Sequence, residues 1–297
     1  MGKILRLDTE TTDPYAPQII LRDKIESKGS LFLFDGNHKL GNTTDPISRV
    51  GDALPNILDD RAAALLGAGD YRFIVLARSP DSNLFKAERT AKGGLYGIVT
   101  QSGAQTSSQS VVIQAAPAIK NYVLANLSHK FYVSLWTRVV RQSLLAGTGQ
   151  SPFHFVNGSG SSTANYLWNY ENGEARPLSG ATLLGRKSEP ANGDVSSQLL
   201  PVPYNRFGVV GVSGVVGSGP AAADGIHMVL GTQGPWNGPN YNKAASRIIY
   251  RAYVEDLTVS GRSYAEVEAI DYALYQEAFA PGGKFYEDSY TNPSTLP

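Results

Sequence analysis

Apolar and polar side chains alternate most regularly over residues 130–141. In an extended chain Phe131 and Val133 would lie on one face of the strand, and Tyr132 and Trp136 on the other. Such alternation is typical of an antiparallel strand that packs one of its faces against a core. We therefore predict a long strand in this segment.

Shorter apolar runs recur along the chain between turn-forming residues, a pattern typical of strands separated by turns. Asn172-Gly173 predicts a two-residue hairpin, because both central residues of a type I′ turn take positive φ. The stretch 146–162 is rich in Gly and Ser, and we expect a mobile loop there. The predicted strands cover residues 31–34, 71–78, 95–100, 111–114, 130–141, 166–170, 207–216, 226–230 and 248–259.

The last predicted strand changes phase near its end. Ile248 and Val254 share one parity, whereas Leu257 and Val259 share the other. A phase change of this kind predicts a bulge or bend, which we place near Glu255.

A helix is predicted to follow this strand. Ser263-Tyr264-Ala265-Glu266 has the form of a capping box, and Pro281 requires the helix to end by Ala280. Residues 53–66 carry a less regular helical spacing. Strands do not alternate with helices and no repeat of about 20–50 residues is visible, which disfavours parallel α/β folds, propellers and solenoids.

These patterns predict an all-β fold, an antiparallel two-sheet sandwich with a short C-terminal helix. We expect an N-terminal arm over residues 1–30, the sandwich over 31–285 and a C-terminal tail over 286–297. The part of the sandwich that the patterns support best is 125–280.

Composition narrows the class of protein. The 297 residues include no cysteine, which excludes disulfides, thiolate metal sites and a cysteine nucleophile. Basic and acidic residues balance at 26 each, which argues against a protein that binds nucleic acid through its phosphates. No segment has the pattern of a signal peptide or a membrane span, so we expect synthesis in the cytoplasm and no membrane insertion.

The acidic residues do not form a catalytic pair in the predicted elements. Glu266, Glu268 and Asp271 fall on the predicted helix, where residues i and i+2 do not share a face. Glu255 and Asp256 are adjacent in a strand and would point to opposite faces. A retaining glycosidase needs two carboxyl groups about 5 Å apart, so we predict no catalytic residues and no enzyme.

Metal and cofactor sites are not predicted either. His38, His129, His154 and His227 lack the spacing of a helical metal pair. Asp35-Gly36-Asn37 with Asp45 has oxygen ligands that calcium accepts, but a turn is the favoured interpretation. The glycines between Gly208 and Gly219 do not form a phosphate loop; strand bulges or close sheet packing explain them better.

The loop over residues 231–242 is the candidate contact surface. Trp236, Asn237, Asn240 and Tyr241 combine flat aromatic rings with amides, as sugar-binding sites and protein hot spots do. The alternative is that Trp236 packs beneath its own loop.

Several segments resemble concanavalin A-like jelly rolls of the laminin-G or pentraxin type. Residues 255–259 followed by 263–267 look like the closing strand and helix of that family. Residues 131–136 resemble its aromatic strand, and residues 171–174 resemble its central Asn-Gly hairpin. The resemblance implies a jelly-roll topology, although no compact Asp/Asn pair stands where calcium-binding members have one.

The chain also resembles, in its general sequence character, structural proteins of tailed bacteriophages, which often lack cysteines and signal peptides. This resemblance implies a non-enzymatic virion component of a tail, baseplate, fibre or capsid decoration. It would act through contacts with other virion proteins, as a homo-oligomer or in many copies, without a cofactor. The alternative is a lectin-like module that binds host-surface glycans, and a glycoside hydrolase or lyase is the third possibility.

Overall fold

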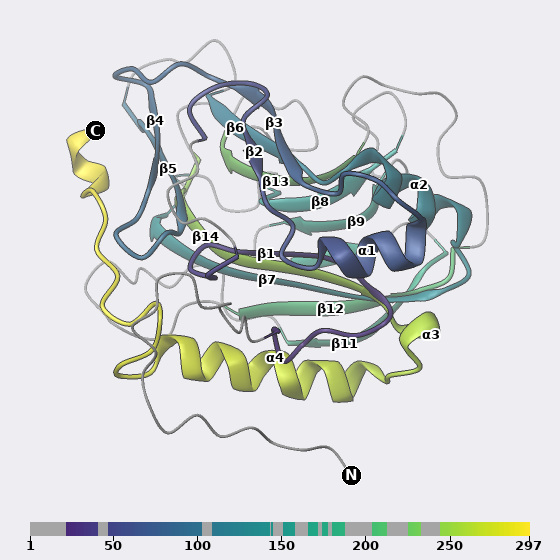
Figure 1. The fold of residues 1–297 in the computed structure, drawn as a ribbon. Coiled ribbons are helices and arrows are strands. Elements are labelled where there is room, and N and C mark those ends of the chain that lie inside the picture. The colour runs from purple at the N-terminus through teal and green to yellow at the C-terminus, as the bar shows by residue number, and fades with distance from the viewer. Residues whose placement is uncertain are drawn as a thin grey trace, which may run out of the picture.

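The computed structural model describes residues 22–40, 47–102, 109–142, 144, 151–157, 166–171, 174–177, 180–187, 204–212, 225–232 and 244–297. Within these ranges the protein is mostly β, with two antiparallel sheets packed face to face and a few short helices (Figure 1). The prediction of an all-β antiparallel sandwich is confirmed at this level.

Seven strands are described in each sheet. In sheet A the order is β11 (Thr182–Lys187), β12 (Tyr204–Val210), β7 (Lys130–Arg141), β14 (Ser246–Asp256), β5 (Leu95–Val99) and β4 (Phe85–Arg89), and β1 (Ser30–Asp35) also pairs with β14. In sheet B it is β10 (Glu174–Pro177), β9 (Tyr166–Glu171), β8 (Phe153–Val156), β13 (Gly225–Gly231), β6 (Ser110–Gln114), β3 (Phe73–Arg78) and β2 (Ala53–Leu54).

The main core lies between the two sheets. Phe32 of β1 meets Phe73 of β3 and Phe153 of β8 edge to face, with ring centroids 5.2 and 6.1 Å apart. Phe131 and Val133 of β7 also point into this core, as their alternation predicts. The predicted Asn-Gly hairpin is confirmed, because Glu171 pairs with Glu174 across the two-residue connection.

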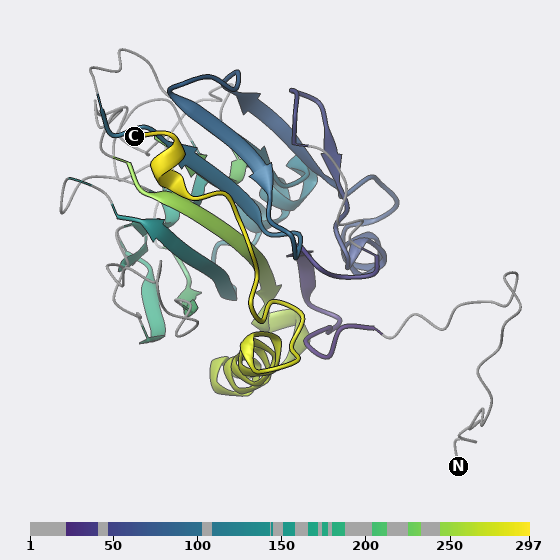
Figure 2. The same cartoon turned by 90° about the vertical axis from the view of Figure 1, so that its left-hand side faces the viewer.

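Helix α4 (Tyr264–Phe279) forms a third layer against the outer face of sheet A (Figures 1 and 2). Trp136 packs edge to face on Tyr275 at 5.7 Å, in a second, largely aromatic core. Sheet A is therefore buried on both faces, whereas the alternation in β7 predicts burial of only one. Gly208 fits this contact: a Cβ there would lie 2.9 Å from the Tyr264 ring, so the expectation of close packing is confirmed at this glycine.

The helices agree with the sequence in part. The capping box of Ser263 and Glu266 is present, and α4 ends at Phe279, as predicted. Helix α1 (Asp59–Leu66) lies inside the segment of less regular helical spacing. Three helical elements of the described part were not predicted: α2 (Pro117–Ala125), the single turn α3 (Leu257–Ser260) and the short 3-10 helix Pro293–Thr295. The strands β2, β4, β8 and β11 were not predicted either. None of the helices in the described part has the length and apolar character needed to cross a bilayer.

One sequence-based expectation is wrong, and a second is confirmed only in part. Phe153–Val156, placed in a mobile loop, forms β8, because Phe153 and Phe155 fill the core despite the Gly and Ser around them. The bulge or bend expected near Glu255 is found in part. The pairing of β1 with β14 shifts there, from Ser30–Glu255 to Phe32–Val254, but the extra residue, Leu31, belongs to β1. Strand β14 itself continues to Asp256, and the phase change at Leu257 marks the start of α3.

The pairing of β14 with β7 shifts between Ile249 and Arg251. Ile249 belongs to the core between the sheets and Tyr250 to the layer under α4. Arg251 also faces that outer side, where its guanidinium lies 4.8 Å from the Trp136 ring. The bulge therefore puts two successive side chains on the face that α4 covers.

Five charged residues, which we call the Arg251 cluster, meet at this bulge. Arg251 is fully buried and donates hydrogen bonds to Asp23 at 2.8 and 2.9 Å and to Asp35 at 2.6 Å. Lys284 also binds Asp35, and Asp271 of α4 lies 4.0 Å from the Arg251 Nε. The cluster thus joins the segment before β1, the strands β1 and β14, helix α4 and the segment after it.

The charges of the Arg251 cluster balance one another. Burial alone would raise the pKa of Asp35, but the Lys284 ammonium and the Arg251 guanidinium hold it below its usual value. Burial raises the pKa of Asp271, and its carboxylate accepts a hydrogen bond from the Tyr132 hydroxyl at 3.0 Å. Two cations, Arg251 and Lys284, therefore face two carboxylates, Asp23 and Asp35, whose pKa values lie below the usual range.

We expect Arg251→Met to lower the free energy of unfolding by about 3–5 kcal/mol, because the carboxylates of Asp23 and Asp35 would stay buried without their main partner. Urea denaturation followed by circular dichroism measures the change. The matched control is Arg72→Met, whose ion pair with Asp70 is exposed and should contribute little. Equal stability of the two variants would contradict the role given to the cluster.

Candidate functional site

The residues predicted as a contact surface cannot be placed. Trp236, Asn237, Asn240 and Tyr241 lie outside the described residues, as does Asp45. Their role stays a prediction.

The acidic pair at the end of β14 is divided between two structural contacts. Glu255 pairs with Arg262 and accepts a hydrogen bond from Tyr253 at 2.7 Å. Asp256 accepts hydrogen bonds from His129 Nδ1 at 2.6 Å and from the Tyr122 hydroxyl at 2.8 Å. The two carboxylates have separate partners and do not act as a catalytic pair.

The acids of α4 are separated in the same way. Glu266 completes the capping box, Glu268 binds Arg206 at 2.6 Å, and Asp271 belongs to the Arg251 cluster. The helix therefore uses each carboxylate for a different contact with its surroundings.

The possible calcium ligands at the end of β1 form a turn. The Asp35 carboxylate accepts a hydrogen bond from the backbone N–H of Asn37 at 3.1 Å and binds Arg251 and Lys284. With its oxygens facing three donors, it is not available to a cation. The described residues contain no group of three or more His, Asp or Glu side chains placed to hold a metal ion.

A small cavity of about 240 Å³ near the start of the described chain is lined by three acids. Asp23 binds Arg251, Glu26 binds both Arg22 and Arg61, and Asp60 binds Arg22. Each carboxylate thus has a guanidinium partner, which leaves none in the cavity as an unpaired acid or base.

Two histidines meet on the outer face of sheet B. His227 Nδ1 lies 3.2 Å from His154 Nε2, and His154 Nδ1 lies 3.2 Å from the Ser151 carbonyl oxygen. The carbonyl can only accept, so His154 carries its proton on Nδ1 and accepts from His227. Gln114 Nε2, 3.2 Å from His227 Nε2, then donates to that nitrogen. The chain of hydrogen bonds is satisfied with both rings neutral.

The environment of the histidine pair also favours the neutral rings. Burial lowers the pKa of His154 to about 4, and burial with the neighbouring His154 lowers the pKa of His227 well below its usual value. Lys120 adds a further positive charge near His227.

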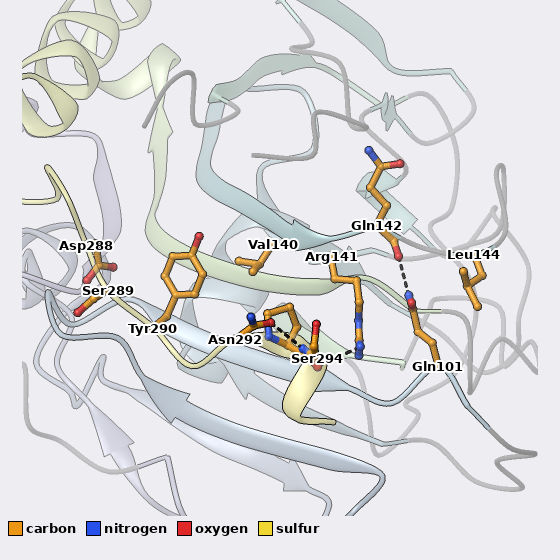
Figure 3. Close-up of a pocket in the computed structure, with 11 residues that line it drawn as sticks. Gln101, Val140, Arg141, Gln142, Leu144, Asp288, Ser289, Tyr290, Asn292 and Ser294 are labelled. Atoms are coloured by element: carbon orange, nitrogen blue, oxygen red, sulfur yellow. Dashed lines mark hydrogen bonds between the residues drawn. The ribbon is translucent and has the colours of Figure 1, made fainter. Parts of the chain in front are cut away.

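Described residues form a groove of about 1040 Å³, which we call the C-terminal groove (Figure 3). It lies between the end of β7 and the segment that follows α4 along the outer face of sheet A (Figure 2). Asp288 and Leu144 lie at its opposite ends in Figure 3. It is lined by Gln101, Val140, Arg141, Gln142, Leu144, Asp288, Ser289, Tyr290, Asn292, Pro293 and Ser294.

Arg141 and Asp288 hold the walls of this groove together. Arg141 donates hydrogen bonds to the carbonyls of Pro293 and Leu296, both at 3.0 Å, and also binds the Val99 carbonyl. Asp288 is 7% exposed and accepts a hydrogen bond from the backbone N–H of Lys92 at 2.8 Å. The two charged lining residues thus fix the backbone around the groove.

Searches of protein-family models, curated proteins and solved structures found no match. The arguments about function therefore rest on this chain alone.

Sequence reasoning missed the C-terminal groove because its walls come from distant segments. Residues 286–297 were interpreted as a polar tail, and nothing in their local pattern shows that they lie beside β7. The one local signal is the run Asn292-Pro293-Ser294, whose residue types are typical of turns. The structure has the short 3-10 helix Pro293–Thr295 there.

We expect the histidine pair to make stability depend on pH. The folded-state pKa of His154 is below its unfolded value, so the unfolded chain binds more protons as the pH falls from about 6.5 to about 4. Stability is complete above this window, and His154 alone should lose about 3 kcal/mol across it. Urea denaturation at a series of pH values measures the loss.

The variant His154→Gln with His227→Gln should flatten this pH dependence. His38, which is also partly buried, supplies the control variant His38→Gln and should have a smaller effect. An unchanged slope in the double variant would refute the assignment. Losses from Asp23 and Asp35 belong to lower pH, since their folded-state pKa values lie below the usual range.

Proposed function

We propose that this chain is a non-enzymatic structural component of a bacteriophage particle. Its place would be the tail or baseplate first and the capsid exterior second, and it would act in many copies through protein–protein contacts. The observation that supports this proposal most directly is the use of the buried carboxylates: Asp35, Glu255 and Asp256 each hold segments of the fold together.

A tightly packed domain suits a structural subunit of an assembly. Sheet A is held between sheet B and α4, and the segment after α4 packs through Phe285 on the same aromatic layer. Both ends of the described part are tied to the body: Asp23 binds Arg251, and the Pro297 carbonyl accepts a hydrogen bond from the Ser102 hydroxyl at 2.8 Å. Rigid surfaces of this sort lose little conformational entropy when copies associate.

The edge of sheet A supports contacts through side chains and not through sheet extension. Its outermost strand on one side, β4, carries Lys86, Glu88 and Arg89. Charged residues on an edge strand discourage uncontrolled pairing with other chains. The formal net charge of zero also avoids long-range repulsion between closely packed copies.

The proposal includes a jelly-roll topology within the sandwich. Its support is the pairing of β1 with β14, which brings the first and last strands of the sandwich together in sheet A. The described residues give the order of the strands within each sheet. The connections that run through the remaining segments, which a jelly roll also requires, belong to the proposal.

Mass spectrometry of particles purified from the organism that encodes this chain tests the function. We expect the chain at a fixed copy number relative to the major capsid protein, and its amount should not fall on further gradient purification. An abundant host cytoplasmic protein, followed in the same fractions, is the control for contamination. Loss of the chain in parallel with that control would contradict the proposal.

A further inference from the structure

We propose that the C-terminal groove is a binding site for a neutral, hydroxyl-rich ligand of the oligosaccharide class. This inference goes beyond the structural role and does not rest on it. It assigns recognition to residues 288–294 and the end of β7, which the sequence-based prediction for Trp236 does not include.

The size of the groove fits such a ligand. Its volume of about 1040 Å³ lies at the upper end of the range of about 300–1,000 Å³ that is usual for ligand pockets. Its length, from Asp288 to Leu144 in Figure 3, suits a chain of several linked rings better than one compact molecule.

The walls are fixed before any ligand binds. Tyr290 packs edge to face on Tyr96 at 5.5 Å, and the Arg138 guanidinium lies 5.9 Å from the Tyr290 ring centroid. Thr291 is bound to Glu88 through its backbone N–H at 3.2 Å and its hydroxyl at 3.0 Å. Because these side chains are held in place, binding would cost little ordering entropy.

Polar groups along the groove remain available. The Tyr290 hydroxyl and the Asn292 Nδ2 form no hydrogen bond with a described residue, although Asn292 Oδ1 accepts one from the Ser294 N–H at 2.9 Å. Gln101, which also lines the groove, donates from Nε2 to the carbonyls of Gln142 and Ala244, and its amide oxygen has no donor among the described residues. Hydroxyl and amide groups of this kind suit ligands that both donate and accept hydrogen bonds.

The charges of the lining argue for a neutral ligand. Arg141 is the one cation among the described lining residues. Its Nη1 and Nη2 donate to three backbone carbonyls, and its Nε is buried. Asp288 is the one carboxylate; it is buried and receives the Lys92 N–H. Among the described lining residues, neither an anion nor a cation therefore finds an exposed partner of opposite charge. An aromatic ring with amides and hydroxyls instead matches the mixed apolar and polar surface of a sugar.

A printed array of neutral oligosaccharides, including linear glucose and N-acetylglucosamine tetramers, tests the proposal with the full chain. The best ligand is then titrated by calorimetry. Tyr290→Phe keeps the packed ring and removes the hydroxyl, and Asn292→Ser keeps a capping oxygen and removes the amide. We expect each to weaken binding by about 3- to 10-fold, the usual effect of one hydrogen bond. Ser294→Trp, which fills the groove, should abolish binding.

The matched controls are Tyr286→Phe and Asn121→Ser, which change the same residue types outside the groove lining. They should bind as the unmodified chain does, and all variants should show the same thermal unfolding. Absence of any array signal from the folded chain would overturn the proposal, as would binding that Ser294→Trp leaves intact. Binding of extended peptides, and not sugars, in the groove would overturn the ligand class. None of these results affects the particle composition that tests the structural role.

Discussion

The fold depends on the neutralisation of one buried cation. Arg251 lies at the centre of sheet A, between the inter-sheet core and α4, where water cannot solvate it. A buried charge is tolerated only when partners of opposite charge and hydrogen bonds replace its hydration. Asp23 and Asp35, the partners of Arg251, lie 228 and 216 residues away in the sequence. The stability of β14 at the centre of its sheet therefore depends on contacts with residues 23–35, far away in the sequence.

The bulge in β14 couples this charge to the third layer. It places Tyr250 and Arg251 on the same face, so the aromatic packing and the ion pairs under α4 form together. Tyr250 packs against Phe279 at 5.2 Å and Phe285 at 4.7 Å, which joins the end of α4 to the segment beyond it. In a strand without the bulge, Tyr250 and Arg251 would point to opposite faces, and one of them would lie in the core between the sheets. A local irregularity thus determines where the C-terminal segment lies.

The sequence predicts what depends on near neighbours. The alternation in β7, the Asn-Gly hairpin and the capping box of α4 are each decided within a few residues, and all three are confirmed. The strand β8 was missed because four residues surrounded by Gly and Ser carry too little pattern, and tertiary packing of Phe153 and Phe155 overrides it. The phase change at Leu257 was visible, but a bulge and a helix start give the same signal.

Prediction from the sequence is more limited for the candidate sites than for the fold. Local spacing correctly separates Glu255 from Asp256, because adjacent strand residues point to opposite faces. The Arg251 cluster and the C-terminal groove unite segments that no local pattern relates. The sequence, for example, places Arg141 at the end of a predicted strand. Its hydrogen bonds to the carbonyls of Pro293 and Leu296 are seen only in the folded structure.

The way the protein uses its charges also limits how it can recognise other molecules. Asp23, Asp35, Glu255 and Asp256 have guanidinium, ammonium or imidazole partners within the fold. Groups that are neutralised internally cannot attract a distant charged partner, and a net charge of zero adds no steering field. Recognition then depends on shape and on uncharged hydrogen-bonding groups, as found around Tyr290. The close, uncharged contacts proposed for the surface agree with this use of charge at the centre of sheet A.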